Sequence, residues 1–301
     1  MRLRRQQGAL LLMVSLALAT IAALALGMNR AAGVDAGSVR RDYEMRAAGY
    51  LAEAGVASSK WVNEVSGCTS KSLTSVALGA GTFSATVPES KGKAKKLDIT
   101  ASGALNGALN GDTVRTLAPR QVTLYDLLNI ETVKLTKGAR NVTIDMWKSE
   151  YDDEDPLVLT FDTSHALLYW DLNDIKKDAL VLSASLTLTH APFSGGTGTV
   201  ALHRVTTRWN DDANWTRPRE EGVRWNGGDY IGAASASTGV TLAGTLTWDV
   251  TGLVDDWFSG RAPNEGLLLR LASAAPILRF YSLDAASARR PVLQVASARP
   301  C

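Results

Sequence analysis

Carboxylate side chains are concentrated in one short stretch of the chain. The sequence Tyr-Asp-Asp-Glu-Asp-Pro places them at four consecutive positions, Asp152, Asp153, Glu154 and Asp155. Calcium is a hard cation that prefers oxygen ligands, so Asp152, Asp153 and Asp155 are candidate ligands for a calcium ion. No regular ligand spacing accompanies them, and a solvated acidic loop is the alternative interpretation.

The residue types that carry most enzymatic catalysis form no motif. The three histidines, His165, His190 and His203, are isolated within or beside expected β-strands, and none has a metal partner at helical or hairpin spacing. Aspartates and glutamates are numerous, but no motif marks a catalytic pair, and glycine-rich nucleotide-binding loops are absent. The sequence therefore predicts a protein that is not an enzyme.

The two cysteines, Cys68 and Cys301, offer one possible cross-link. In an exported chain they could form a disulfide that ties the last residue to an earlier part of the sequence. Pairing requires Cα atoms within roughly 7 Å, which a sequence does not show. Two unpaired thiols are the alternative.

The charge balance argues against nucleic acid as a partner. Lysine and arginine number 32 and aspartate and glutamate 30, so the formal net charge is +2. Contacts to phosphate need clustered basic side chains. The basic run of residues 90–96 contains no aromatic residue that could stack on bases, and it fits a solvated hairpin tip.

The beginning of the chain predicts a membrane-spanning helix. An uncharged apolar run covers residues 9–28, which matches the roughly 20 residues that a helix needs to cross a bilayer. Arginines at positions 2, 4 and 5 precede it, so the positive-inside rule keeps this end in the cytoplasm and sends the rest outward.

The residues after the span predict a continuation of the helix and then a small sheet. Over residues 31–64, apolar and small side chains recur at helical spacing, among them Leu51, Ala57 and Trp61. Short strand-like runs separated by turn residues follow over residues 66–117. We expect the helix to bury its apolar stripe against a small antiparallel sheet.

The N-terminal motifs carry a family resemblance. A short basic leader ends in Gln7-Gly8, the sequence ALLLM follows, and the span runs into RRDYEMRAAGYLAEAGVASSKWV. Over roughly the first 65 residues this resembles the type IV minor pilins of the PilX kind. The resemblance implies cleavage between Gly8 and Ala9 by a prepilin peptidase, and interactions of the N-terminal helix with other pilins and the pilus assembly machinery.

One position departs from that pattern. Most major pilins carry a glutamate at the fifth mature position, which is Met13 here. Entry into a filament is therefore left open, and an uncleaved signal anchor is the alternative to pilin-like processing.

From Gln121 onward the chain predicts a series of β-strands. In residues 182–189, leucine and alanine alternate with serine and threonine, which puts one face on a core and the other toward water. Many short strands of this kind are typical of a β-sandwich. One helical turn is expected at Thr251–Phe258, capped by Thr251 and ended by Gly260.

The same region resembles a second family. Five phrases follow one another between about Leu157 and Val295: ALLYWDLNDI, ALVLSASLTLTH, VALHRVTTRWNDDANWTRP, WDVTGLVDDWFSGRAPNEGLLLRL and FYSLDAASARRPVLQV. Their order resembles the DNRLRE domain, a jelly-roll family also classed as carbohydrate-binding module family 96. The resemblance implies a non-catalytic module that binds polysaccharide or shapes a surface protein.

Exposed aromatic faces are the expected means of contact with a sugar ring. Four aromatic residues lie in polar or glycine-rich stretches and are candidates for carbohydrate contact: Trp147, Tyr151, Trp225 and Tyr230. For each of them a partly buried loop anchor is the alternative. The remaining tryptophans of this region are expected mostly in the core: Trp170, Trp209, Trp215, Trp248 and Trp257.

Together these observations predict a mainly β protein with a long N-terminal α-helix. The expected order is a leader (1–8), a transmembrane or pilin helix (9–30), a pilin-like head of helix and small sheet (31–120) and a jelly-roll β-sandwich (121–301). We expect an inner-membrane protein with its C-terminus outside, associated with a pilus or the cell surface, whose sandwich binds carbohydrate or another surface ligand. A purely structural pilin or pseudopilin and an anchored polysaccharide-active enzyme are the alternatives.

Overall fold

The computed structural model describes residues 36–89, 95–105, 113–148, 156–192, 198–219, 223–240, 244–273 and 277–301. The predicted cleavage site, the predicted span and the predicted calcium loop lie outside these residues. No helix within the described ranges combines the length and the hydropathy that crossing a bilayer requires.

The chain divides into two compact units. The first contains the chain up to Leu124 together with Cys301, and the second extends from Tyr125 to Pro300. The break falls four residues after the boundary that the sequence suggests, because strand β5 (Arg120–Thr123) pairs with β3 (Lys96–Leu105) of the first unit.

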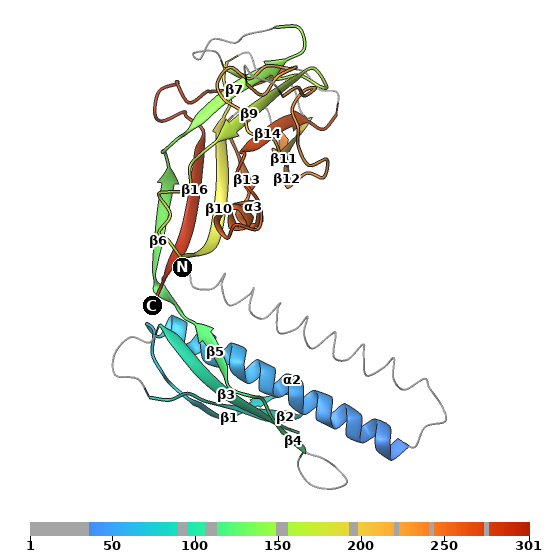
Figure 1. The fold of residues 1–301 in the computed structure, drawn as a ribbon, viewed down its shortest axis with the longest axis vertical. Helices are drawn as coiled ribbons and strands as arrows, with labels where there is room; N and C mark the ends of the chain where they lie inside the picture. The colour runs from blue at the N-terminus through green and yellow to red at the C-terminus, as the bar shows by residue number, and fades with distance from the viewer. Residues whose placement is uncertain are drawn as a thin grey trace. The chain divides into compact units, whose positions relative to one another are not determined.

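The first unit consists of one helix and one antiparallel sheet. Helix α2 covers Ala36–Val65 and lies along one face of the sheet (Figure 1). The strands follow the order β1-β2-β3-β4, and β5 pairs with β3 on the side of β4. The other three strands are β1 (Leu73–Leu78), β2 (Gly81–Thr86) and β4 (Thr113–Thr116).

The buried face of α2 differs from the predicted stripe. Leu51 is buried against the sheet, but Ala57 is exposed and the side chain of Trp61 is 44% exposed. The predicted stripe drifted off the packed face because small and apolar residues occur on both sides of this helix. The face that packs is marked by a close approach instead: a Cβ on Gly103 would lie 2.6 Å from the Cβ of Leu51.

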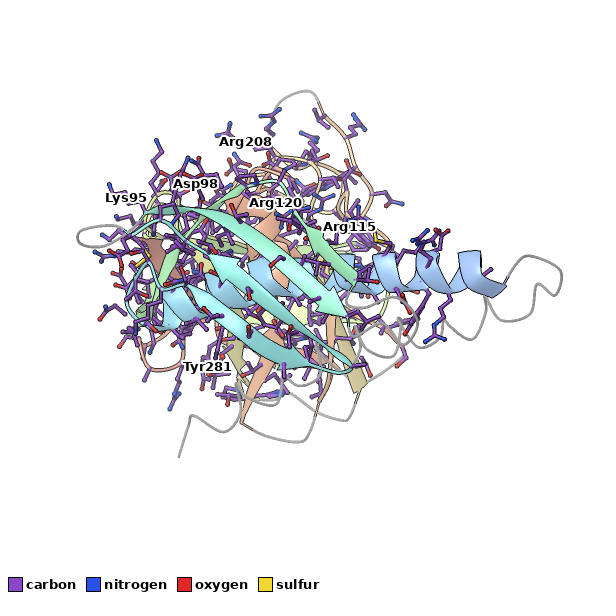
Figure 2. The ribbon with its side chains drawn as sticks, turned by 90° about the horizontal axis from the view of Figure 1, so that it is seen from below. Lys95, Asp98, Arg115, Arg120, Arg208 and Tyr281 are labelled. Atoms are coloured by element: carbon purple, nitrogen blue, oxygen red, sulfur yellow. A yellow bond between two sulfur atoms is a disulfide. The ribbon has the colours of Figure 1, made fainter. Side chains whose placement is uncertain are left out.

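Two arginines of strands β4 and β5, labelled in Figure 2, contact α2. Arg120 of β5 donates two hydrogen bonds of 2.6 Å to the carboxylate of Glu53. The side chain of Arg115, on β4, lies over Gly49. Both partners of the Arg120–Glu53 ion pair are well exposed, so it adds no more than about 1 kcal/mol to stability.

The second unit contains two larger antiparallel sheets and one short ladder. One sheet has the order β13-β10-β16-β6, the other has the order β12-β11-β14-β9-β7, and β15 pairs with β8. The strands of the first sheet are β13 (Thr245–Asp249), β10 (Leu180–Thr189), β16 (Val292–Pro300) and β6 (Tyr125–Leu135). Those of the second are β12 (Ala236–Val240), β11 (Gly198–Arg204), β14 (Leu267–Leu271), β9 (Ser164–Tyr169) and β7 (Arg140–Asp145). The ladder joins β15 (Leu278–Phe280) and β8 (Leu157–Leu159).

Both larger sheets contribute to one apolar core. Leu186 of β10 and Val295 of β16 belong to the same buried cluster as Leu202 of β11 and Leu269 of β14. The predicted alternation holds at Ala184, Leu186 and Leu188, which are buried. It fails at Leu182, because the β10–β16 register shifts between Val181 and Ser183, and Val181 takes the inward place.

Helix α3 (Thr251–Phe258) lies where the sequence predicts it. The predicted cap is wrong: the Thr251 side chain donates to Asp249 Oδ1 at 2.6 Å and makes no capping bond to the helix. Hydrogen bonds from Thr251 also lower the pKa of the Asp249 carboxyl. The predicted end is confirmed, since Gly260 has a positive φ of 73° and donates to the carbonyl of Trp257.

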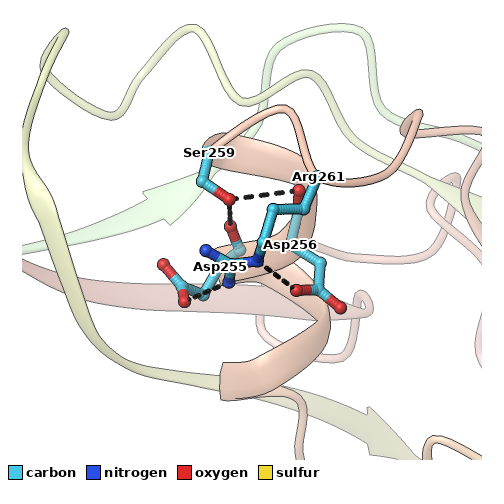
Figure 3. A network of polar contacts seen from close by, with 4 residues as sticks. All are labelled: Asp255, Asp256, Ser259 and Arg261. Carbon is cyan, nitrogen blue, oxygen red and sulfur yellow. Dashed lines mark hydrogen bonds and ion pairs between the residues drawn. The ribbon is translucent and has the colours of Figure 1, made fainter.

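The end of α3 carries a polar network (Figure 3). Arg261 bridges Asp255 and Asp256, and the hydroxyl of Ser259 donates to the backbone carbonyl of Asp255 at 2.6 Å. One guanidinium thus pairs with both carboxylates. The network terminates the helix and offers no free carboxylate pair for catalysis.

Candidate ligand-binding site

Trp147 is the most exposed large apolar residue in the described part of the chain. It follows β7 in a tight turn, and 82% of its surface is accessible. Its neighbour Met146 is 43% exposed. An indole with this exposure can stack on a sugar ring or on another flat apolar group.

The turn that carries Trp147 is fixed by hydrogen bonds. Asp145 Oδ1 accepts from the backbone N–H of Trp147 at 2.8 Å and from that of Lys148 at 3.0 Å. The N–H of Met146 donates to the carbonyl of Thr163 at 2.9 Å. An aspartate that bonds the backbone two residues on is a recurrent turn device. These bonds order the backbone of the turn, while the indole stays exposed.

Trp225 is not the exposed face that the sequence suggests. Its side chain is 7% exposed, and its indole N–H donates to the carbonyl of Asn214 at 2.6 Å. It belongs to a tryptophan cluster on the β7, β9 and β14 strands, made of Ile144, Leu167, Val205, Trp209, Ala213, Trp215, Trp225 and Leu268. Trp225 is buried because its loop packs against the sheet.

Two glycines allow the loop to lie that low. Gly227 and Gly228 have positive φ values of 72° and 98°. A Cβ on Gly227 would lie 2.8 Å from the Trp215 ring, and one on Gly228 would lie 2.6 Å from the Leu268 side chain. The glycine-rich stretch around Trp225 marks close packing rather than exposure.

Tyr230 is half-buried, and both its ring and its hydroxyl contact other side chains. Arg270 donates to the hydroxyl at 2.8 Å, and the ring of His203 lies 4.9 Å away between centroids. The other guanidinium nitrogen of Arg270 donates to Asp162 at 2.6 Å. Tyr230 therefore contacts strands β11 and β14, and its ring is a less accessible stacking surface than Trp147.

His165, on strand β9, anchors the loop that contains Gly227. The sequence analysis did not predict this role. Its Nδ1 donates to the carbonyl of Gly227 at 2.8 Å, and its ring lies 5.1 Å from that of Trp215. Burial lowers the pKa of His165 to about 4, against a hydrogen bond to Gly227 that raises it. The imidazole is therefore neutral at pH 7, and its Nε2 has no partner among the described residues.

The other predicted site residues lie outside the described part of the chain. They are Tyr151, Asp152, Asp153 and Asp155, together with Gly8 and Ala9 at the predicted cleavage site. The calcium and cleavage predictions therefore stay predictions. In the part of the chain that the structure covers, no three His, Cys, Asp or Glu side chains gather in a way that could hold a metal ion. The tryptophans expected in the core are all buried: Trp170, Trp209, Trp215, Trp248 and Trp257.

Cys68 and Cys301 are joined by a disulfide. Their Cα atoms lie 5.8 Å apart across a sequence separation of 233 residues. Disulfides persist mainly in oxidising compartments, so this bond suits a chain that is exported.

Comparison with known proteins adds no family. No protein-family model matches the chain, and no curated protein sequence matches it. The resemblances to PilX-type minor pilins and to the DNRLRE domain therefore stay predictions.

Proposed function

We propose that this chain is an envelope-anchored, outward-facing protein whose second unit is a jelly-roll β-sandwich that binds carbohydrate or another surface ligand. The observation that carries the proposal is Trp147, which is 82% exposed on a turn whose backbone donates two hydrogen bonds to Asp145. A turn that is ordered before binding lowers the entropy lost when the indole stacks on a ligand. The disulfide supports the outward location.

The proposal assigns no catalytic step to the chain. The adjacent carboxylates Asp255 and Asp256 are both paired with Arg261. The buried imidazole of His165 is neutral and covered by its loop. The exposed indole of Trp147 is an aromatic surface that is suited to binding.

Binding of the full chain to a panel of purified polysaccharides tests the proposal. We expect Trp147→Ala to weaken binding by at least tenfold, because stacking on an aromatic face would supply much of the affinity. Ile277→Ala is the matched control, since Ile277 is another exposed apolar residue of the second unit, at 41%. Equal binding by wild type and Trp147→Ala would remove Trp147 from the site, and no binding to any polysaccharide would remove carbohydrate as the ligand.

The anchoring part of the proposal has a separate test. N-terminal sequencing of the mature chain should find Ala9 as the first residue if a prepilin peptidase acts at Gly8. An intact Met1 would contradict pilin-like processing and leave the signal-anchor interpretation.

One observation favours a purely structural assembly role as a second candidate. Three aromatic side chains of α2 stay exposed in the first unit: Tyr43 at 41%, Tyr50 at 48% and Trp61 at 44%. They recur at the spacing of one helix face and would suit packing against another helix. Loss of pili on deletion of the gene, combined with no polysaccharide binding, would favour this candidate.

A further inference from the structure

The second unit is inserted between two residues of the first that lie side by side. The chain leaves the first unit after Leu124 and returns to it at Cys301. The backbone N–H of Cys301 donates to the carbonyl of Leu124 at 3.0 Å, and its sulfur is bonded to Cys68. Both covalent routes into the second unit therefore start from one place.

The two routes also enter the second unit at neighbouring positions. Tyr125, at the start of β6, is the Cα partner of Pro300, at the end of β16. Strands β6 and β16 lie side by side in Figure 1. Strand β16 lies between β10 and β6 and pairs with both along most of its length. A pull along β16 must therefore shear two hydrogen-bonded ladders at the same time.

Cys68 is fixed to the end of α2. It lies three residues after Val65, is 1% exposed and has a positive φ of 65°. Its N–H donates to the carbonyl of Asn63 at 2.9 Å. The Asn63 side chain is buried and holds the following loop: its amide donates to the carbonyls of Ser59 and Lys71, and its oxygen accepts from Thr69 and from the N–H of Lys71.

The alternative route from α2 to the second unit runs through the small sheet. It passes from Cys68 along β1 to β5 and reaches Leu124. Strand β1 is an edge strand, its side chains are largely exposed, and its pairing with β2 shifts register between Leu73 and Val76. A pull on the start of β1 would detach it from β2 one hydrogen bond after another, which needs less force than shear.

We infer that this protein is built to carry tension between α2 and the second unit, and that the Cys68–Cys301 bond keeps the β1–β5 sheet out of the load path. While the bond is intact and the second unit is folded, Cys68 is joined to Tyr125 through Cys301, Pro300 and the Tyr125–Pro300 pair. Force then passes from α2 through the disulfide into the shear-resistant strand β16. The covalent path through the small sheet is loaded only when the bond is absent.

The inference rests on the proposed function for the origin of the tension. An anchor at the N-terminal end and a ligand held by the second unit would pull on these two points. The load path itself depends only on connectivity and pairing, so it can be tested without any ligand. Its failure would leave the Trp147 result untouched, and a failure of carbohydrate binding would leave the load path untouched.

Single-molecule pulling on the full chain tests the inference. One handle is attached at the N-terminal end and the other at Gly232, an exposed position of the second unit with no atom within 4 Å of an added Cβ. We expect reduced wild type to show an early low-force step of roughly 200 Å, the extension of residues 69–124 at about 3.6 Å per residue. Oxidised wild type should lack this step and first yield at higher force.

The double variant Cys68→Ser with Cys301→Ser is the matched control. It should show the early step both with and without reductant, which separates loss of the bond from other effects of the reductant. An early step in oxidised wild type at the same force as in reduced wild type would overturn the inference. So would the absence of this step in both reduced wild type and the double variant, or two alkylatable thiols in protein isolated without reductant.

Discussion

The two units of this chain gain their stability in different ways. Counting only described residues, the main core cluster of the second unit contains 29 buried residues and the cluster of the first unit contains seven. Burial stabilises by about 25 cal/mol per Å² of apolar surface, so apolar burial contributes much more free energy to the second unit than to the first. The first unit instead has the disulfide and the hydrogen bonds of Asn63. A small core is supplemented by cross-links, while a large one folds without them.

Loss of the disulfide should produce the largest difference in stability between the two units. With the second unit folded, the bond closes a loop of about 57 residues, for which the chain-entropy relation gives about 4 kcal/mol. We expect Cys68→Ser with Cys301→Ser to remove roughly that much stability from the first unit and little from the second. Hydrogen exchange should accelerate in α2 and β3 and stay unchanged in β10 and β14. Equal acceleration in both sets of elements would contradict this assignment.

Replacing Asn63 should weaken the first unit by a smaller amount. Its side chain makes four hydrogen bonds at a position with no exposed surface. Asn63→Leu keeps the volume and leaves several backbone groups unpaired, at a cost of about 3 kcal/mol. Hydrogen exchange of α2 again measures the loss. Asn173→Leu, at an exposed position, is the control and should change stability by less than about 0.5 kcal/mol.

Acid should act on the second unit through His165. The folded-state pKa is about 4 and the ordinary value is 6.5, so the unfolded chain takes up this proton first as the pH falls. Stability is therefore complete above pH 6.5 and declines toward pH 4, by about 2.5 kcal/mol at pH 4.5.

The variant His165→Gln isolates this effect from other titrating groups. Glutamine can still donate to the Gly227 carbonyl but does not titrate. The difference in urea stability between pH 7 and pH 4.5 should be about 2.5 kcal/mol smaller in the variant than in wild type. Tryptophan fluorescence reports mainly on the second unit, since Trp61 is the only tryptophan of the first. An unchanged difference would show that His165 takes up its proton at the same pH in both states.

Local sequence patterns predicted the elements of both units better than their contacts. The periodicity of residues 31–64, the alternation in β10 and the glycine after α3 each depend on neighbours in sequence, and each corresponds to a real element. The register shift at Val181 and Ser183 depends on β16, more than 100 residues away, and no local pattern marks it. The disulfide is a similar case, since its cysteines are 233 residues apart.

The candidate site shows the same limit. Trp147 and Trp225 both lie in polar or glycine-rich stretches, and their neighbours in sequence do not distinguish an exposed indole from a buried one. Their fates differ because Gly227 and Gly228 let one loop pack onto the sheet, whereas Asp145 turns the other outward. The role of His165 was hidden for the same reason: its partner Gly227 is 62 residues away.

The smallest stability effect is expected at Trp147. Within the second unit, this exposed tryptophan can be compared directly with the buried Trp248. Trp147→Ala should change the stability of the second unit by less than about 0.5 kcal/mol, because an indole that is 82% exposed loses little contact. Trp248→Ala removes a side chain that is 1% exposed, and it should cost about 3–5 kcal/mol. Urea unfolding of the two variants measures both values. A large loss in Trp147→Ala would mean that this indole supports the fold, and weaker ligand binding by that variant would no longer identify a contact site.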